Sequence, residues 1–91
     1  QPPRDDCSNG PELRRRGRDA AAAGQDVLAL ALAEQMMRCG DNDRAAYNLA
    51  AFAACRSRNA AKARHYFPHV GPARRAAVRE VCSRNQIELP P

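Results

Sequence analysis

Alanine constrains this chain more than any other residue type. Nineteen of its 91 residues are alanine, and the chain contains no tryptophan. Alanine has the highest helix propensity, but its side chain removes little apolar surface from water. A core built from alanine is shallow and gains packing energy only where backbones approach closely. We therefore expect an all-α fold of closely packed helices.

Four cysteines offer this small chain a second source of stability. A domain of this length buries only about 60 to 65 % of its unfolded surface, which leaves a thin margin. The cysteines stand at positions 7, 39, 55 and 82, and none has the C-x-x-C spacing of zinc or thioredoxin-type sites. An even number in a short chain favours structural disulfides and an oxidising compartment. The alternative is a cytosolic helical protein with small buried thiols.

Arginine supplies almost all of the positive charge, with 14 arginines, one lysine and a formal net charge of +5. Abundant arginine and alanine together are what a GC-rich genome encodes. Nucleic-acid sites usually gather basic residues on one face and interleave them with aromatic rings. Here the densest group, Arg14, Arg15, Arg16 and Arg18, surrounds one helix. We therefore expect a solvated basic surface that suits an acidic protein partner, and we do not expect nucleic acid.

The sequence shows no membrane-spanning segment. No stretch approaches the roughly 18 uninterrupted apolar residues that a span requires. The opening QPPRDD is polar and rich in proline, so it does not resemble a signal peptide. We expect a chain without a membrane span that is a mature or excised fragment.

Proline and glycine mark the first helix boundaries. Pro11 opens a helix, because proline at the first helical position sacrifices no hydrogen bond, and Gly24 ends it. The next run, VLALAL at 27–32, alternates large and small side chains, as a strand would. Only Val27 in it is β-branched and alanine favours helices, so we predict a helix there as well.

Further breaks set the remaining boundaries. The stretch GDND stops the second helix and offers Asp41, Asn42 or Asp43 as the next N-cap. Pro68 cannot continue the fourth helix. The chain is therefore predicted to consist of an extended lead-in (1–10), a helical domain (11–85) and a tail (86–91) that folds back through Ile87 and Leu89. The predicted helices of the domain are 11–23, 26–39, 43–57, 60 to Pro68 and 72–85.

An internal period of 34 residues relates the two halves of the helical domain. The inter-helix breaks at Gly24 and Arg58 recur at this spacing. The matching pairs are Leu13 with Tyr47, Gly17 with Ala51, Ala20 with Ala54, Ala29 with Ala63, Ala33 with Phe67 and Met36 with Val70. In these residues the chain resembles the tetratricopeptide repeat family, whose unit has a large residue at position four and small residues at positions eight and twenty.

The resemblance covers about residues 11–85 and implies stacked antiparallel helix pairs, namely two units and a C-terminal capping helix. The chain is also similar to repeat regions of GC-rich bacteria, including extracytoplasmic parts of bacterial serine/threonine kinases. It departs from the family pattern at the seventh position of the unit, where Arg16 and Ala50 replace the usual leucine.

This arrangement implies which cysteines meet. In an antiparallel pair, the second helix returns to the start of the first, which brings Cys39 to Cys7. First helices of neighbouring units run parallel, so Cys55 and Cys82, which follow their helix starts at similar spacing, lie at similar height. Cys39 and Cys55 would be separated by about 18 Å. We expect Cys7–Cys39 and Cys55–Cys82 bridges, each contributing roughly 3 to 4 kcal/mol in the chain-entropy model.

The resemblance also implies a groove, lined by the first helix of each unit, that commonly holds a peptide in this family. Its lining in this sequence consists of Arg14, Arg18, Asn48, Phe52, Arg56 and Arg79. Guanidinium and amide groups suit carboxylate-bearing segments, and Phe52 supplies an apolar contact. The alternative is that two units are too few for a deep groove and that these arginines are ordinary solvated residues.

Patterns typical of catalysis and metal binding are weak. His65 and His69 have i, i+4 spacing, but Pro68 interrupts the helix between them and no further ligand type lies nearby. Bridged cysteines leave no thiol nucleophile, and carboxylates such as Glu34 and Glu80 stand alone. We expect no enzyme, no cofactor and no metal site.

The sequence thus predicts a disulfide-stapled interaction or scaffolding module in the periplasm or the cell exterior. Its partner is expected to be an acidic peptide or protein surface, and the module would suit the sensor or partner-binding region of a larger bacterial signalling or envelope protein. The alternative is a basic nucleic-acid-binding helical domain with reduced cysteines.

Overall fold

The fold was analysed in a computed structural model that describes residues 7–41 and 43–91. The regular structure of these residues is entirely helical, which confirms the all-α prediction. The elements are α1 (Gly10–Ala22), α2 (Asp26–Arg38), α3 (Arg44–Arg56), α4 (Ala60–Tyr66), the 3-10 helix η1 (Phe67–His69) and α5 (Pro72–Arg84). The predicted boundaries of α1, α2, α3 and α5 agree to within one residue, whereas α4 ends at Tyr66 and the 3-10 helix η1 contains Pro68. Most of the predicted lead-in, residues 1–6, and the N-cap candidate Asn42 lie outside the described residues.

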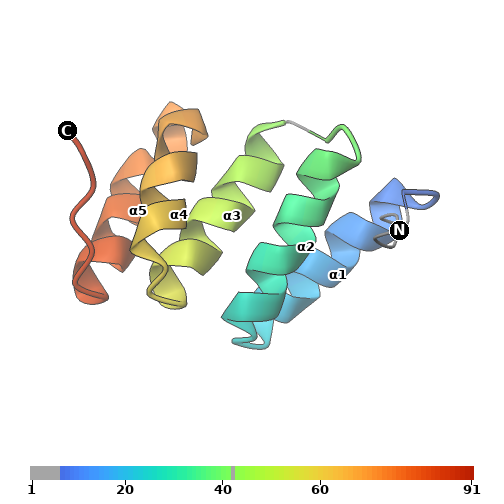
Figure 1. The fold of residues 1–91 in the computed structure, drawn as a ribbon, viewed down its shortest axis with the longest axis horizontal. Helices are drawn as coiled ribbons and strands as arrows, with labels where there is room; N and C mark the ends of the chain where they lie inside the picture. The colour runs from blue at the N-terminus through green and yellow to red at the C-terminus, as the bar shows by residue number, and fades with distance from the viewer. Residues whose placement is uncertain (1–6, 42) are drawn as a thin grey trace.

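The helices form a stack in which chain neighbours run antiparallel (Figure 1). Helices α1, α3 and α5 run in one direction, and α2 and α4 run in the opposite direction. Helix α3 lies in the middle and contacts α1, α2, α4, η1 and α5. The stack therefore consists of two antiparallel pairs, α1–α2 and α3–α4, followed by α5 packed on α3. It measures 37 × 26 × 22 Å.

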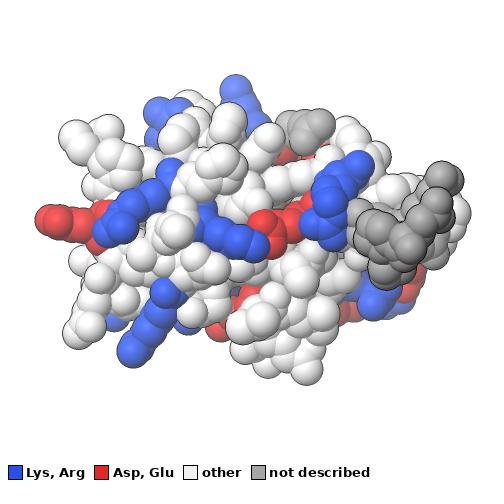
Figure 2. Space-filling model, viewed as in Figure 1, with Lys and Arg blue, Asp and Glu red and all other residues white. Residues whose placement is uncertain are grey.

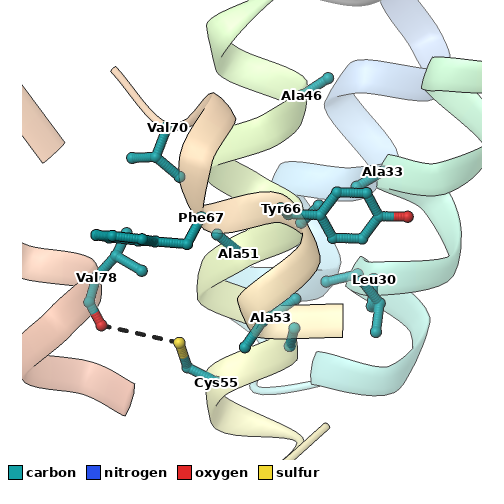
Figure 3. Close-up of a cluster of buried hydrophobic side chains, with 14 of the residues drawn as sticks. Leu30, Ala33, Ala46, Ala51, Ala53, Cys55, Tyr66, Phe67, Val70 and Val78 are labelled. Atoms are coloured by element: carbon teal, nitrogen blue, oxygen red, sulfur yellow. Dashed lines mark hydrogen bonds between the residues drawn. The ribbon is translucent and has the colours of Figure 1, made fainter. Parts of the chain in front are cut away.

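Small residues of α3 form the centre of the core. The residues of this helix that are at most 1 % exposed are Ala46, Ala50, Ala51, Ala53, Ala54 and Cys55. Larger side chains surround them, and Figure 3 shows how two consecutive ones divide between neighbours. Phe67 points toward Val78 of α5, whereas Tyr66 points the other way, toward Leu30 and Ala33 of α2. The junction of α4 and η1 thus joins the two ends of the stack.

Gly17 sets the distance between α1 and the rest of the stack. A Cβ atom at this position would lie only 2.8 Å from Leu49 Cδ2 of α3, and 3.8 Å from Leu32 Cβ and Met36 Sδ of α2. The closest of these contacts is with Leu49 of the next pair, so Gly17 lets α1 approach α2 and α3 together.

The four helices of 13 residues, α1, α2, α3 and α5, all end in the same backbone motif. The second residue after each helix has a positive φ angle, and these residues are Gly24 (74°), Gly40 (90°), Arg58 (59°) and Gln86 (62°). The next amide donates to a carbonyl five residues back at 2.8 to 2.9 Å, in the bonds Gln25 to Ala20, Asp41 to Met36, Asn59 to Ala54 and Ile87 to Cys82. This is the Schellman motif. Arg58 and Gln86 adopt in it the left-handed conformation that glycine favours.

Side-chain caps start three of the helices. At the start of α1, Asn9 Oδ1 accepts a hydrogen bond from the Glu12 amide at 3.1 Å. At the start of α4, Asn59 Oδ1 accepts a hydrogen bond from the Lys62 amide at 3.2 Å. Asp43 Oδ1 accepts from the Ala46 amide at 3.1 Å. Asp43 is therefore the N-cap of α3 among the predicted candidates.

Two disulfides connect the cysteine pairs that the sequence analysis expected. The Cα atoms of Cys7 and Cys39 are 5.4 Å apart, and those of Cys55 and Cys82 are 4.6 Å apart. Both Cys55 and Cys82 are completely buried between α3 and α5, and Cys55 Sγ lies 3.8 Å from the Val78 carbonyl oxygen (Figure 3). Two bridges in so small a chain are typical of an oxidising, extracytoplasmic setting.

We expect Ala51→Leu to destabilise the stack by about 1 to 3 kcal/mol, because the larger side chain overpacks the fully buried face of α3. Urea unfolding followed by circular dichroism measures the change. Ala45→Leu is the matched control, since Ala45 lies on the same helix but is exposed. Equal stability of Ala51→Leu and the wild-type chain would contradict the close packing of α3.

The two disulfides should differ in their rates of reduction. Thiol exchange requires access to a sulfur atom, and Cys7 is exposed, whereas Cys55 and Cys82 are buried. Under a limiting dithiol in native buffer, iodoacetamide should label Cys7 and Cys39 first. Peptide mass spectrometry measures the labelling at each cysteine. Simultaneous labelling of all four would show that burial does not protect the second bridge.

Candidate functional site

Three of the six residues of the predicted groove, Arg14, Asn48 and Arg79, have structural partners within the chain. Arg14 is engaged in an ion pair that joins α1 to the loop between α2 and α3. Its Nε lies 2.6 Å from Asp41 Oδ2, and its Nη2 lies 3.6 Å from Asp43 Oδ2. The hydrogen bond to Asp41 raises the pKa of the Arg14 guanidinium. Arg14 therefore has carboxylate partners within the chain itself.

Arg79 is engaged with Phe67 and with the segment after α5. Its guanidinium lies 4.6 Å from the centre of the Phe67 ring. It also donates to the Leu89 carbonyl oxygen at 3.4 Å and to the Pro90 carbonyl oxygen at 2.6 Å. Arg79 thus holds the segment that follows α5.

Asn48 has a structural partner as well. Its side chain is half-buried, and Oδ1 accepts a hydrogen bond from the Gly71 amide at 3.3 Å. This bond fixes the start of α5 against α3, which leaves the Asn48 amide nitrogen as the group available to a ligand.

The other three predicted residues, Arg18, Phe52 and Arg56, lie on the contacting helices α1 and α3. Phe52 and Arg56 share a face of α3, with the Arg56 guanidinium 5.6 Å from the Phe52 ring centre. Leu49 lies one turn before Phe52 on the same face, and it packs against Gly17, which Arg18 follows. We call Arg18, Leu49, Phe52 and Arg56 the α1–α3 face. It combines two half-buried apolar side chains with two exposed guanidinium groups.

A polar network that the sequence analysis missed joins α2 to α4. Glu34 Oε1 accepts from Lys62 Nζ at 2.7 Å, and Glu34 Oε2 accepts from the Tyr66 hydroxyl at 2.5 Å. Burial opposes ionisation of Glu34, but these two hydrogen bonds outweigh it and lower its pKa below the ordinary 4.5. Burial and the bond to Glu34 raise the pKa of Tyr66 to about 12. No motif or repeat spacing links these three positions in the sequence.

Aromatic rings extend this network and account for both histidines. The His69 ring stacks on Tyr47 with centroids 4.5 Å apart, and the His65 ring meets Tyr66 edge-on at 5.0 Å. Tyr47 and Tyr66 in turn lie 6.2 Å apart. Within the described ranges, no group of three or more His, Cys, Asp or Glu side chains is placed to hold a metal ion. The arrangement is that of a packing cluster between α3 and α4.

The charged side chains do not form one continuous basic field on the face shown in Figure 2. Lysine and arginine alternate there with acidic side chains in a band across the molecule. The Lys62–Glu34 pair, with its 2.7 Å separation, is one such contact. Nucleic-acid sites instead gather basic residues without interruption.

Apolar exposure is confined to a small area at the start of α2. The exposed large hydrophobic side chains in the described part of the chain are Val27, at 75 %, and Leu28, at 45 %. They line an open hollow together with Gly24, Gln25, Asp26 and Ala31. Two such side chains supply far less than the roughly 800 Å² per partner of a standard interface.

Comparisons with known proteins leave the α1–α3 face without a counterpart. No protein-family model, curated protein sequence or solved structure matches the chain. None of the helices in the described ranges has the length and apolarity to cross a membrane. The function is therefore argued from the geometry of this chain.

The Glu34 network should make stability depend on pH in the acidic range. A carboxyl with a lowered pKa stabilises the fold above its unfolded pKa of about 4.5, and this contribution is lost as pH falls through its folded pKa. Glu34→Gln should therefore lower the thermal midpoint of unfolding at pH 7. Near pH 3, the thermal midpoint of this variant should approach that of the wild-type chain. Thermal unfolding at a series of pH values measures this difference.

Tyr66→Phe is the matched control, because it removes one hydrogen bond to Glu34 and retains the carboxylate and Lys62. It should reduce the pH dependence without abolishing it. The role of the ionised carboxylate would be contradicted if the thermal midpoints of the wild-type chain and Glu34→Gln differed by the same amount from pH 7 to pH 3.

Proposed function

We propose that this chain is a protein-interaction module of tetratricopeptide type that binds an acidic segment of a partner on its α1–α3 face. One observation carries the proposal. Arg18 and Arg56 have no carboxylate partner among the described residues, and the Arg56 guanidinium lies over the half-buried Phe52.

Two other exposed arginines differ in this respect. Arg15 pairs with Glu12 and Asp19 on its own helix, and Arg84 pairs with Glu80. Their charges are neutralised locally, whereas those of Arg18 and Arg56 are open to a partner. Guanidinium groups form short, two-pronged hydrogen bonds with carboxylates, and the net charge of +5 attracts acidic partners over a longer range.

The Phe52 ring adds an apolar and an orienting contribution. A guanidinium within about 6 Å of an aromatic ring face is attracted by the ring quadrupole, so the ring restrains Arg56 at 5.6 Å. A partner carboxylate that meets Arg56 then places its neighbouring side chain beside Phe52 and Leu49. The preferred ligand is an acidic segment that carries one apolar residue.

The spacing of 34 residues and the antiparallel stacking support the tetratricopeptide resemblance. Two disulfides favour the periplasm or the cell exterior. The module then suits the sensor or partner-binding region of a larger bacterial signalling or envelope protein.

We expect Arg18→Glu with Arg56→Glu to weaken binding of an acidic peptide by about tenfold or more, because each change replaces an attractive charge with a repulsive one. The probe is a fluorescein-labelled peptide of six glutamates around a central leucine, and fluorescence anisotropy at 0.15 M salt measures its affinity. The thermal midpoint should stay close to that of the wild-type chain, since both side chains are exposed.

Arg16→Glu with Arg74→Glu is the matched control. It changes the net charge equally, and both residues are exposed and form no ion pair within 4 Å in the described part of the chain. Equal loss of binding in the two double variants would reduce the interaction to net charge and exclude a defined face. Tighter binding of a DNA duplex than of the peptide would favour the nucleic-acid alternative instead.

A further inference from the structure

The segment after α5 is held in two different ways. Ile87 belongs to the end of α5, because its amide donates to the Cys82 carbonyl at 2.9 Å in the Schellman motif and its side chain is buried. From Glu88 onward the chain has no regular structure. Figure 1 shows it running back along the outer side of the stack beside α5. We call residues 88–91 the strap.

Two arginines hold the strap by its backbone. Arg64 Nε of α4 donates to the Glu88 carbonyl oxygen at 3.0 Å. Arg79 of α5 donates to the Leu89 and Pro90 carbonyl oxygens at 3.4 and 2.6 Å. The Leu89 side chain packs, half-buried, against the core. Recognition therefore depends on an extended backbone and on one apolar side chain, whereas the Glu88 side chain is exposed.

The position of Arg79 explains why an extended segment lies here. Arg79 is the eighth residue of α5, as Gly17 is of α1 and Ala51 is of α3. Those small residues are buried where the next helix packs. In α5 the equivalent place carries a long side chain stacked on Phe67. A helix cannot approach α5 as closely there, whereas an extended chain can accept the guanidinium hydrogen bonds.

The strap can be released without unfolding a helix. The hydrogen bonds from Arg64 to Glu88 and from Arg79 to Pro90 are solvent-exposed. Leu89 is the half-buried side chain that anchors the strap. A hollow of about 270 Å³ lies at the base of the strap, lined by Ser83, Gln86, Ile87 and Glu88. Few buried contacts and exposed hydrogen bonds are the properties of segments that open locally.

We propose that the surface formed by Arg64, Phe67 and Arg79 is a second peptide-binding site, which the strap occupies in the same chain. Its external ligand is an extended segment of a partner protein that carries a leucine followed by proline. The leucine takes the place of Leu89, and the partner's carbonyl oxygens accept from Arg64 and Arg79. Proline favours the extended conformation in advance, which lowers the entropy cost of binding.

A partner protein is a better external occupant than a second copy. The strap of each copy is tethered to its own site through Ile87, so its effective concentration there is on the order of millimolar. Another copy offers the same contacts without that advantage. A partner segment that also contacts the surface beside the site can compete with the strap.

The test uses the full chain with Leu89→Ser, which loosens the strap and leaves Ile87 in place. The probe is the peptide Gln-Ile-Glu-Leu-Pro-Pro, acetylated and amidated, titrated into ¹⁵N-labelled protein. The Arg64 Nε–H resonance reports occupancy of the site. We expect saturable binding to Leu89→Ser that is at least tenfold tighter than to the wild-type chain, whose own strap competes.

Three comparisons make the result specific. A peptide with serine in place of leucine should not bind, Arg79→Ala in the Leu89→Ser chain should weaken binding at least tenfold, and Arg74→Ala on the same helix should not. Leu89→Ala replaces Leu89→Ser if the serine variant is unfolded by circular dichroism.

Two results would overturn the proposal. One is that the folded Leu89→Ser or Leu89→Ala chain shows no saturable shift of the Arg64 resonance, or that it binds the leucine and serine peptides equally. The other is a wild-type dimer in size-exclusion chromatography that Leu89→Ser dissociates, because the external occupant would then be a second copy.

Discussion

The close approach of α3 to its neighbours is the constraint on which the remaining structure depends. Helix α3 contacts α1, α2, α4, η1 and α5, and its buried residues are alanines and one cysteine. Helices of 13 residues are only marginally stable alone in water, so each outer helix relies on its contacts within the stack. A larger side chain on α3 would displace neighbours on both sides, because they pack against one another through this helix.

The direction of each helix follows from how the preceding one ends. After α1, α2 and α3, the Schellman motif reverses the chain within a few residues, which gives antiparallel neighbours. Helix α4 ends differently, in η1, where Pro68 removes a backbone donor. The chain then travels through Val70 and Gly71 before α5 begins. This different connection places α5 directly on α3, where the buried disulfide joins the two helices.

The sequence was sufficient to predict the helices, because their starts and ends carry local signals such as Asp43, Gly24 and Pro68. The cysteine pairing followed from the stacked helix pairs that the tetratricopeptide resemblance implied. The side-chain network of Glu34, Lys62 and Tyr66 could not be predicted, since it depends on how far α4 is offset along α2. A propensity or a repeat period does not encode that offset.

Arg79 shows the same limit within the predicted groove. Counted from the helix starts, Arg18 and Phe52 are the ninth residues of α1 and α3, whereas Arg79 is the eighth residue of α5. Arg79 therefore lies on a different face of its helix. As a result, Arg79 meets the segment after α5, and the α1–α3 face retains Arg18, Phe52 and Arg56 from the predicted set.

The alanine-lined interior has an energetic consequence of its own. Burying a leucine or methionine restricts several rotatable bonds, whereas an alanine methyl group has no rotamers to lose. The six small buried residues of α3 therefore contribute little transfer free energy and lose almost no side-chain entropy when the chain becomes ordered. A centre of this kind therefore lets the helices pack without rearrangement of interior side chains.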